Sequence, residues 1–326
     1  MKKWRNIILV LLGGCSFGIL STFVKLSYEK GLSLADVTSA QAYFGAAILW
    51  LFLLIYKGTA LLNGGGRIRR VSAAGIEQLK IKNKVSTRLR LILTGMASGA
   101  ISICYYKCVE HMAASIAIIL LMQYTWMSIL LERFIFKIPV TGRKWLFVGI
   151  VLLGTILGSG LIGQRGTVDI AWSSIAYGLL AGFFYAVFIL ANGHVGNEMP
   201  AVIKSSWVVL GVVLLIMAVF PPFGKLVSLM HHQALPNYLK QVAVSGLLLG
   251  FFGMVLPPLL FASAIPKIGV ALSSILGSIE LPTAALCGYF VLQENISLWQ
   301  LAGILFILGA IIIVNIEPKP NGQHRT

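Results

Sequence analysis

Charged residues are scarce in this chain of 326 residues, and acidic residues are the scarcest. Asp and Glu together number 10 against 26 Lys and Arg, and charged residues make up only 11% of the chain. Soluble domains contain roughly 25% charged residues, so a water-soluble fold of this size would lack polar surface. Hydrophobic residues reach 58%, and the mean hydropathy is +0.89. The composition therefore predicts an all-α polytopic membrane protein whose apolar surface is covered by lipid.

Cysteine is also rare, and its placement argues against a disulfide framework and against a metal site. All four cysteines lie inside apolar stretches, which favours buried thiols over a disulfide framework. Cys104, Cys108 and His111 share one helical face, but no fourth ligand accompanies them and Lys107 lies beside them, so packing is favoured over a metal site. The sequence holds no nucleophile–base constellation and no glycine-rich nucleotide motif. We expect no metal, no cofactor and no enzymatic activity.

The net charge of +16 raises the question of a nucleic-acid partner. The basic residues lie between apolar segments rather than on one polar face, so nucleic acid is not expected. The expected partners are the lipid bilayer and a small-molecule substrate. A homodimer is a further alternative.

Apolar runs of about 20 residues, separated by short charged turns, predict about ten membrane-spanning helices. The N-terminal run resembles a signal peptide with a lipoprotein-like Cys15, but it stays apolar beyond that cysteine, which favours an uncleaved helix. The predicted helices are 7–27, 36–56, 90–109, 112–131, 144–162, 171–191, 202–220, 240–264, 268–292 and 298–316.

The basic residues predict the orientation of the chain. With the N-terminus inside, most Lys and Arg fall in inner segments, including a long basic loop near 57–89 that contains three consecutive glycines. The positive-inside rule then predicts a bacterial inner (plasma) membrane protein with cytoplasmic N- and C-termini.

The two halves of the chain, 1–163 and 164–326, resemble each other. Gly14 and Gly18 in the first helix match Gly178 and Gly182 in the sixth, and both pairs form Gly-x-x-x-Gly. The fifth and tenth helices each open with Trp and carry Gly four residues later. Because each half has five helices, the halves must face opposite ways, as in inverted-repeat transporters with a substrate site near the midplane.

Glu280 is the sharpest single feature, because it lies near the middle of an apolar helix. A charge at mid-bilayer costs roughly 2.5–3.5 kcal/mol, so this side chain is predicted to face the protein interior. There it is a candidate proton carrier or partner for a substrate cation, and the alternative is a neutral acid that only ties helices together. Pro282 frees a backbone carbonyl nearby, which fits either a cavity wall or a static kink.

Helix four carries a polar and aromatic patch that includes Gln123, Tyr124 and Trp126 at the position corresponding to Glu280. Such a patch suits a small-molecule site, and interhelical hydrogen bonding is the alternative. Lys25 and Lys107 lie near the outer ends of their helices. They could attract an anionic substrate, although lysines in such places more often reach out to lipid headgroups.

The segment from Leu272 to Leu292 has a mid-helix Glu and Pro, and it is followed by Gln293-Glu294 and Trp299-Gln300-Leu301-Ala302-Gly303. This pattern resembles the EamA-type permeases of the drug/metabolite transporter superfamily. The resemblance implies ten helices in two inverted five-helix repeats and transport of amino acids, metabolites or drugs. By position, Glu280, Pro282 and Glu294 match the family motif, whereas the first repeat departs from it at Tyr124-Thr125-Trp126.

The sequence thus predicts a secondary transporter that moves a small metabolite, amino acid or drug-like solute by alternating access, with proton coupling through Glu280 as one form. The alternatives are a polytopic membrane enzyme, which would need clustered acidic or histidine residues, and a non-transporting scaffold or sensor.

Overall fold

The computed structural model describes residues 2–62, 81–111, 114–158, 172–221, 235–293 and 297–316, and helices account for nearly all of them. The first half of the chain contains α1 (Lys2–Glu29), α2 (Leu34–Leu62), α4 (Ile81–His111), α5 (Ala114–Met122), α6 (Tyr124–Phe136) and α7 (Gly142–Gly158). The second half contains α8 (Trp172–His194), α9 (Ala201–Val219), α11 (Leu235–Leu249), η1 (Gly250–Val255), α12 (Leu256–Ile268), α13 (Val270–Gly277), α14 (Glu280–Leu292) and α15 (Leu298–Ile316).

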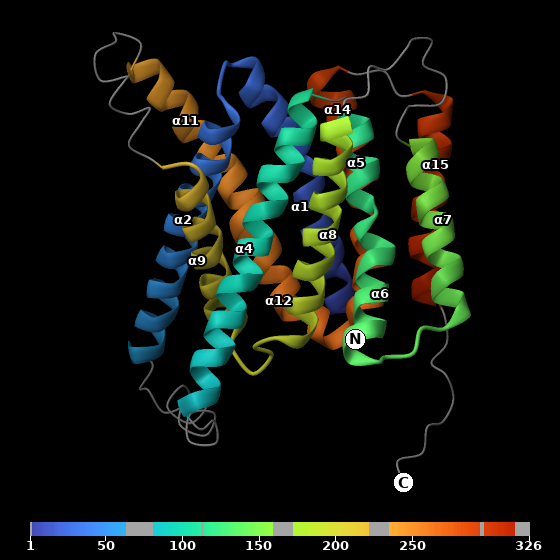
Figure 1. The fold of residues 1–326 in the computed structure, drawn as a ribbon, viewed down its shortest axis with the longest axis horizontal. Helices are drawn as coiled ribbons and strands as arrows, with labels where there is room; N and C mark the ends of the chain where they lie inside the picture. The colour runs from blue at the N-terminus through green and yellow to red at the C-terminus, as the bar shows by residue number, and fades with distance from the viewer. Residues whose placement is uncertain are drawn as a thin grey trace.

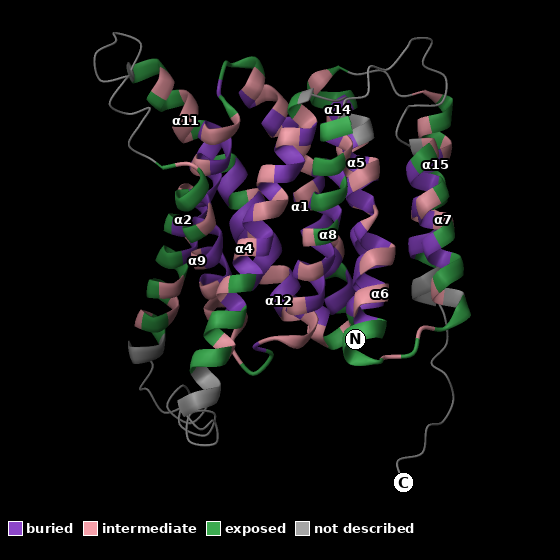
Figure 2. Cartoon of the chain, in the orientation of Figure 1, coloured by how far each residue is buried: buried purple, intermediate pink, exposed green. Residues whose placement is uncertain are grey.

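Within the described residues, these elements form ten apolar crossings. Eight are long and apolar enough to span a membrane, and two shorter ones, Lys144–Leu157 and Leu298–Ile312, belong to α7 and α15. Large apolar side chains cover the outside, for example Leu54 at 66% and Phe134 at 75% exposure. Buried residues gather inside the bundle instead (Figure 2). This distribution is what lipid, and not water, stabilises, and it confirms the predicted polytopic helical fold.

Three predicted helices are more divided than expected. The fourth crossing breaks at Gln123 between α5 and α6, and the ninth breaks at Ser278–Ile279 between α13 and α14. The eighth crossing contains the π-helical turn η1, which ends just before Pro257 and Pro258. These prolines cannot donate backbone hydrogen bonds to the preceding turn, which explains the irregularity there. The predicted loop 57–89 is helical at both ends, in α2 and α4, while residues 63–80, with the three glycines, lie outside the described residues.

Local sequence explains where two of the helices begin. Before α2, Asp36 accepts hydrogen bonds from the backbone and hydroxyl of Ser33, at 2.8 and 2.7 Å. Before α15, Ser297 and Gln300 exchange backbone–side-chain hydrogen bonds of 2.8 and 3.2 Å. Both are capping boxes, which satisfy backbone N–H groups that a helix start leaves unpaired.

The two halves run in opposite directions through the bundle. In Figure 1 α1 rises from the edge that carries the N-terminus, and α8 descends toward that edge. We call this edge the lower side and the opposite edge, with the ends of α1 and α4 at Glu29 and His111, the upper side. The fourth crossings match closely: α6 and α14 are each 13 residues long, and each is followed by a residue in the left-handed region, Lys137 and Gln293.

The halves do not form separate bundles, because their helices are exchanged. α1 packs against α12 and α14 of the other half, and α8 packs against α4 and α6. Likewise α2 packs on α11 and η1, α9 packs on α4, and α7 pairs with α15. The result is a first bundle (α1, α2, α11, η1, α12 and α14) and a second bundle (α4, α5, α6, α8 and α9), each built from both halves.

Glycines allow the closest of these contacts, at equivalent interfaces in the two bundles. A side chain on Gly95 of α4 would collide with the backbone of Val208 in α9, and one on Gly211 would collide with Ile92. In the first bundle, a side chain on Gly250 of η1 would meet the backbone of Gly45 in α2 at 2.6 Å. Small residues therefore hold each bundle together, as is usual where lipid removes the hydrophobic drive between helices.

Candidate functional site

Glu280 is the first residue of α14, directly after the break in the ninth crossing. It is only 2% exposed, and its Oε1 atom accepts a hydrogen bond from the Tyr185 hydroxyl of α8. This bond joins the first bundle to the second. The acid therefore lies inside the protein near the middle of the ninth crossing and faces the protein interior, as predicted from the sequence.

The break that positions Glu280 has a clear origin in the sequence. Pro282 has no N–H to donate to the carbonyl of Ser278 one turn earlier. The chain there uses tighter bonds instead, from Ile279 N to Leu276 O and from Leu281 N to Ser278 O, both 3.2 Å. The short turn ends α13 and starts α14 with Glu280 facing inward. Pro282 is buried behind this turn and does not line the cavity described next.

A cavity opens beside Glu280 between the two bundles. It contains about 570 Å³ of space not filled by protein, including the part open to solvent, and side chains from α1, α2, α4, α5, α8, η1 and α14 line it. Its lining residues on α1, α2 and α4 lie from the middle of these helices toward their upper ends, and α5 is itself the upper part of the fourth crossing, so the cavity occupies the upper half of the bundle.

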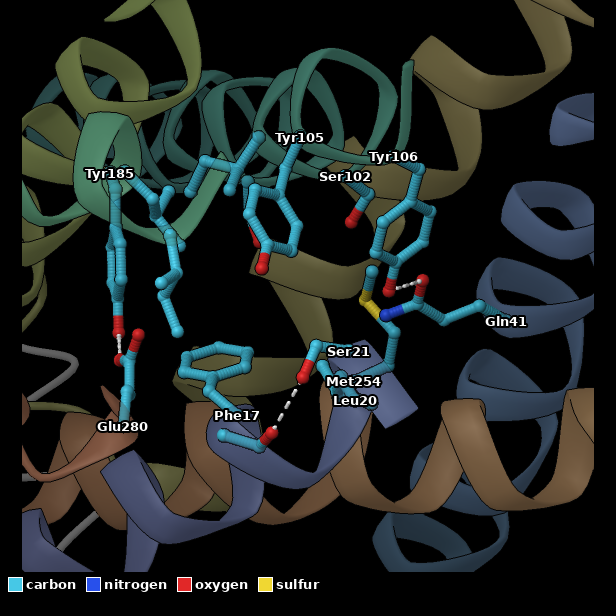
Figure 3. A pocket seen from close by; sticks show the side chains of 16 residues that line it. Phe17, Leu20, Ser21, Gln41, Ser102, Tyr105, Tyr106, Tyr185, Met254 and Glu280 are labelled. Atoms are coloured by element: carbon cyan, nitrogen blue, oxygen red, sulfur yellow. Dashed lines mark hydrogen bonds between the residues drawn. The ribbon is translucent and has the colours of Figure 1, made fainter. Parts of the chain in front are cut away.

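The walls of the cavity combine aromatic rings with a few polar groups (Figure 3). Phe17 and Tyr185 meet edge to face, with ring centres 5.6 Å apart. Tyr105 points its hydroxyl into the space between Glu280 and the opposite wall. On that wall the Tyr106 hydroxyl donates to Gln41 Oε1 at 2.8 Å. An acid at one end and an amide–hydroxyl pair at the other can orient a bound molecule.

Tyr124 lies beneath this cavity and helps to close its lower side. Its ring packs against Tyr185 at 4.2 Å between centres, and its hydroxyl donates to the Ser274 carbonyl at 3.3 Å. The Ser128 and Ser274 hydroxyls are 2.6 Å apart. The two contacts with Ser274 belong to the interface of α6 with α13. The equivalent upper elements, α5 and α14, form no comparable packed interface within the described ranges.

The other predicted site residues lie away from the cavity. Gln123 accepts a hydrogen bond from the Trp126 indole at 2.8 Å, so these two side chains are hydrogen-bonded to each other at the α5–α6 break. Lys107 pairs with Glu110 at 3.0 Å near the surface, and Lys25 is half-buried in α1. None of the four lines the cavity. Tyr124 is in contact with the site through Tyr185, and Glu280 alone of the predicted residues lines it.

Sequence reasoning did not single out Tyr185, Tyr105, Tyr106 and Gln41, which line the cavity with Glu280. A tyrosine in an apolar helix is ordinary, so only the fold shows that these residues share one space. Near the lower end of α6, Glu132 is buried, 3.0 Å from the His194 ring that stacks on Phe136.

The sequence favours a packing role over metal binding for Cys104 and Cys108. In the structure both are buried free thiols. The side chain of His111 lies outside the described residues. Among the residues that the structure does describe, no group of three or more His, Cys, Asp or Glu is placed to hold a metal ion.

The fold and the site together define a multi-pass helical membrane protein with an internal repeat and a buried acid beside a central cavity. Comparison with known proteins names the family. The model of the EamA-like transporter family matches residues 4–160 and 172–316, one stretch in each half. The chain therefore belongs to the EamA-like transporter family, as its sequence pattern indicated. The members of this family are transporters of small solutes rather than enzymes.

A solved crystal structure shares the fold. It is 14% identical to this chain, with a TM-score of 0.62, and the match covers 94% of this chain and 98% of the other. No curated protein matches the chain.

Proposed function

We propose that this protein carries a small organic solute across the membrane by alternating access, with Glu280 at the binding site. The observation that carries the proposal is a cavity in the upper half of the bundle, with a buried acid at its base and packed helices α6 and α13 below it. A site near mid-membrane between repeated units is typical of secondary transporters. In this proposal, Glu280 binds either the substrate or a coupling proton.

The described basic residues support an orientation. Most of them lie at lower helix ends: Lys3, Arg5, Lys57, Arg88, Arg90, Arg133, Lys137, Lys144, Lys204 and Lys267. The positive-inside rule makes this side cytoplasmic. The orientation proposed for the protein in a bacterial inner membrane therefore has both termini facing the cytoplasm. The described conformation then corresponds to a state closed toward the cytoplasm.

The packing of the helices suggests which parts move. Rocking one sequence half against the other would break the extensive contacts of α1 with α12 and of α8 with α4. Movement of the first bundle against the second keeps those contacts intact and changes the contacts of α2 with α9 and of α12 with α8 and α9. The cavity lies between these bundles, and the Tyr185–Glu280 hydrogen bond crosses between them. We therefore propose that the two exchanged bundles are the moving units.

Cysteine accessibility tests alternating access without knowledge of the substrate. Ser102, which lines the cavity, is replaced by Cys in a chain whose four native cysteines are changed to Ala. A membrane-impermeant maleimide is then applied to right-side-out and to inside-out vesicles. We expect labelling from both sides, because each conformation opens the cavity to one side.

The matched control is Ile129→Cys, a fully buried position outside the cavity, which is expected to resist labelling from either side. Glu29→Cys and Lys137→Cys report the upper and lower surfaces respectively. Labelling of Ser102→Cys from one side only, with both surface reporters behaving correctly, would contradict alternating access and favour a non-transporting role.

A further inference from the structure

The cavity has an unbalanced charge. Glu280 is the one acidic residue among its described lining residues, and none of them is Lys, Arg or His. A carboxylate or phosphate ligand would find no opposite charge there and would face an acid at close range. A charged acid in a buried place is stabilised by a cation. The cavity therefore favours a positively charged ligand over an anionic one.

The hydrogen bonding of Glu280 leaves room for such a ligand. Tyr185 donates to Oε1, and within the described residues no hydrogen bond reaches Oε2. A carboxylate accepts bonds at both oxygens. Glu280 lines the cavity, so an ammonium group of a ligand can donate to Oε2 while Tyr185 holds the carboxylate in place (Figure 3).

The aromatic walls suit the same charge. Phe17 and Tyr185 lie edge to face next to the acid, and Tyr105 faces the same space. Aromatic faces attract organic cations, and most strongly where water is excluded. The same rings also cover an apolar body attached to the cation. The Gln41–Tyr106 pair on the opposite wall is placed for a neutral polar group at the far end of the ligand.

We infer that the cavity binds organic monocations, namely amines with an aromatic or aliphatic body, with the ammonium on Glu280 Oε2. This inference rests on the proposed transport function of the same cavity, and it adds the charge and class of the substrate. Tyr185 acts as a positioning residue, because it contacts the acid and fixes its orientation.

Three probes of similar shape and different charge test the inference: phenethylammonium, phenethyl alcohol and 3-phenylpropanoate. Their binding to the purified full-length protein is measured by isothermal titration calorimetry. We expect phenethylammonium to bind about tenfold or more tightly than either other probe, since hydrogen bonds to charged groups are the stronger ones. Equal or tighter binding of 3-phenylpropanoate would overturn the inference.

Variants assign the preference to the acid. Glu280→Gln is expected to bring phenethylammonium down to the affinity of phenethyl alcohol, and Glu280→Asp to keep the preference for the cation. Glu29→Gln removes an exposed acid at the upper end of α1 and should change nothing. Tyr185→Phe should weaken the binding of phenethylammonium several-fold, but phenethylammonium should still bind more tightly than phenethyl alcohol. Undiminished cation preference in folded Glu280→Gln protein would contradict the assignment.

The result is separable from that of the labelling experiment. If Ser102→Cys reacts from both sides but phenethylammonium is not preferred, alternating access stands and the cation class is wrong. If the labelling fails and the cation still binds at Glu280, the cavity is a cation site in a protein that does not transport.

Discussion

The fourth crossings of the two halves share one backbone design and differ in chemistry. α6 and α14 each run 13 residues from a break to a left-handed residue. Their positions can therefore be paired: Tyr124 with Glu280, Ser128 with Ala284, and Ser274 of α13 with Ile118 of α5. The second half has an acid that lines the cavity, whereas the first has a tyrosine packed beneath it.

Packing differs between the same two crossings. Ser128 meets Ser274 on the lower side, but the paired residues Ile118 and Ala284 belong to α5 and α14, which form no comparable interface among the described residues. A symmetric backbone repeat thus holds one packed interface on the lower side and no comparable one on the upper side among the described residues. In the alternating access that we propose, exchange of the two arrangements would open the opposite side.

The largest expected effect is the difference in transport between substitutions at the paired residues Glu280 and Tyr124. We expect Glu280→Gln to lower the flux of phenethylammonium into proteoliposomes by about tenfold to a hundredfold, because a charge-assisted contact is lost. Tyr124→Phe removes only a long hydrogen bond of 3.3 Å and is expected to keep flux within about threefold. Both variants are reconstituted at matched protein amounts. Similar flux in the two variants would show that Glu280 and Tyr124 contribute equally to transport, which contradicts the expected difference between the two halves.

A disulfide across the lower interface tests the second difference. The Ser128 and Ser274 hydroxyls are 2.6 Å apart, so Ser128→Cys with Ser274→Cys lies within reach of a disulfide. In the labelling experiment, oxidation of this pair is expected to abolish reaction of Ser102→Cys from the lower side and to preserve it from the upper side.

The paired upper positions supply the control for this disulfide. Ile118→Cys with Ala284→Cys should cross-link slowly, and only in molecules whose upper side has closed. Once formed, that bond should block labelling from the upper side. Rapid cross-linking of both pairs in the same molecules would contradict the idea that the two interfaces close in turn.

Glycine contacts within the two bundles should differ in their tolerance to a methyl group. In Gly95→Ala the new methyl meets the backbone of Val208, which cannot yield easily, and a loss of about 3 kcal/mol is expected. In Gly45→Ala it meets the Cβ atom of Met254, which is fixed to the backbone of η1 but overlaps the methyl less than the Val208 carbonyl does, so a smaller loss of about 2 kcal/mol is expected. Thermal melting of detergent-solubilised protein measures both. Gly309→Ala, with open space around the added atom, is the matched control and should not lower the melting temperature.

The sequence predicted some of these features and not others, for physical reasons. The ten crossings follow from apolar runs that only lipid can cover, and Glu280 stands out because a charge inside such a run is costly. The break at Ser278 has a signal in Pro282, but the break at Gln123 has no proline after it and was predicted as continuous helix. A break without a proline depends on tertiary packing, which sequence periodicity does not contain.

The cavity walls were hidden for a similar reason. Tyr185 and Tyr105 belong to different crossings, and nothing in either helix marks them as partners of Glu280. The polar residues Gln123 and Trp126, by contrast, were conspicuous in sequence but satisfy each other by a local hydrogen bond. The polar residues that stand out within one helix therefore mark the break in that helix. The cavity beside Glu280, by contrast, is formed by contacts between different helices.

The smallest expected effect concerns the left-handed residues that end α6 and α14. A residue with a side chain pays roughly 1–2 kcal/mol for this conformation, and glycine does not. Lys137→Gly and Gln293→Gly should each raise the melting temperature slightly, offset in part by the greater freedom of glycine in the unfolded chain. If the two ends are true equivalents, with φ of 56° at both, the two gains should agree. A gain at one position and a loss at the other would mean that the surrounding contacts, and not the repeated backbone, determine how each helix ends.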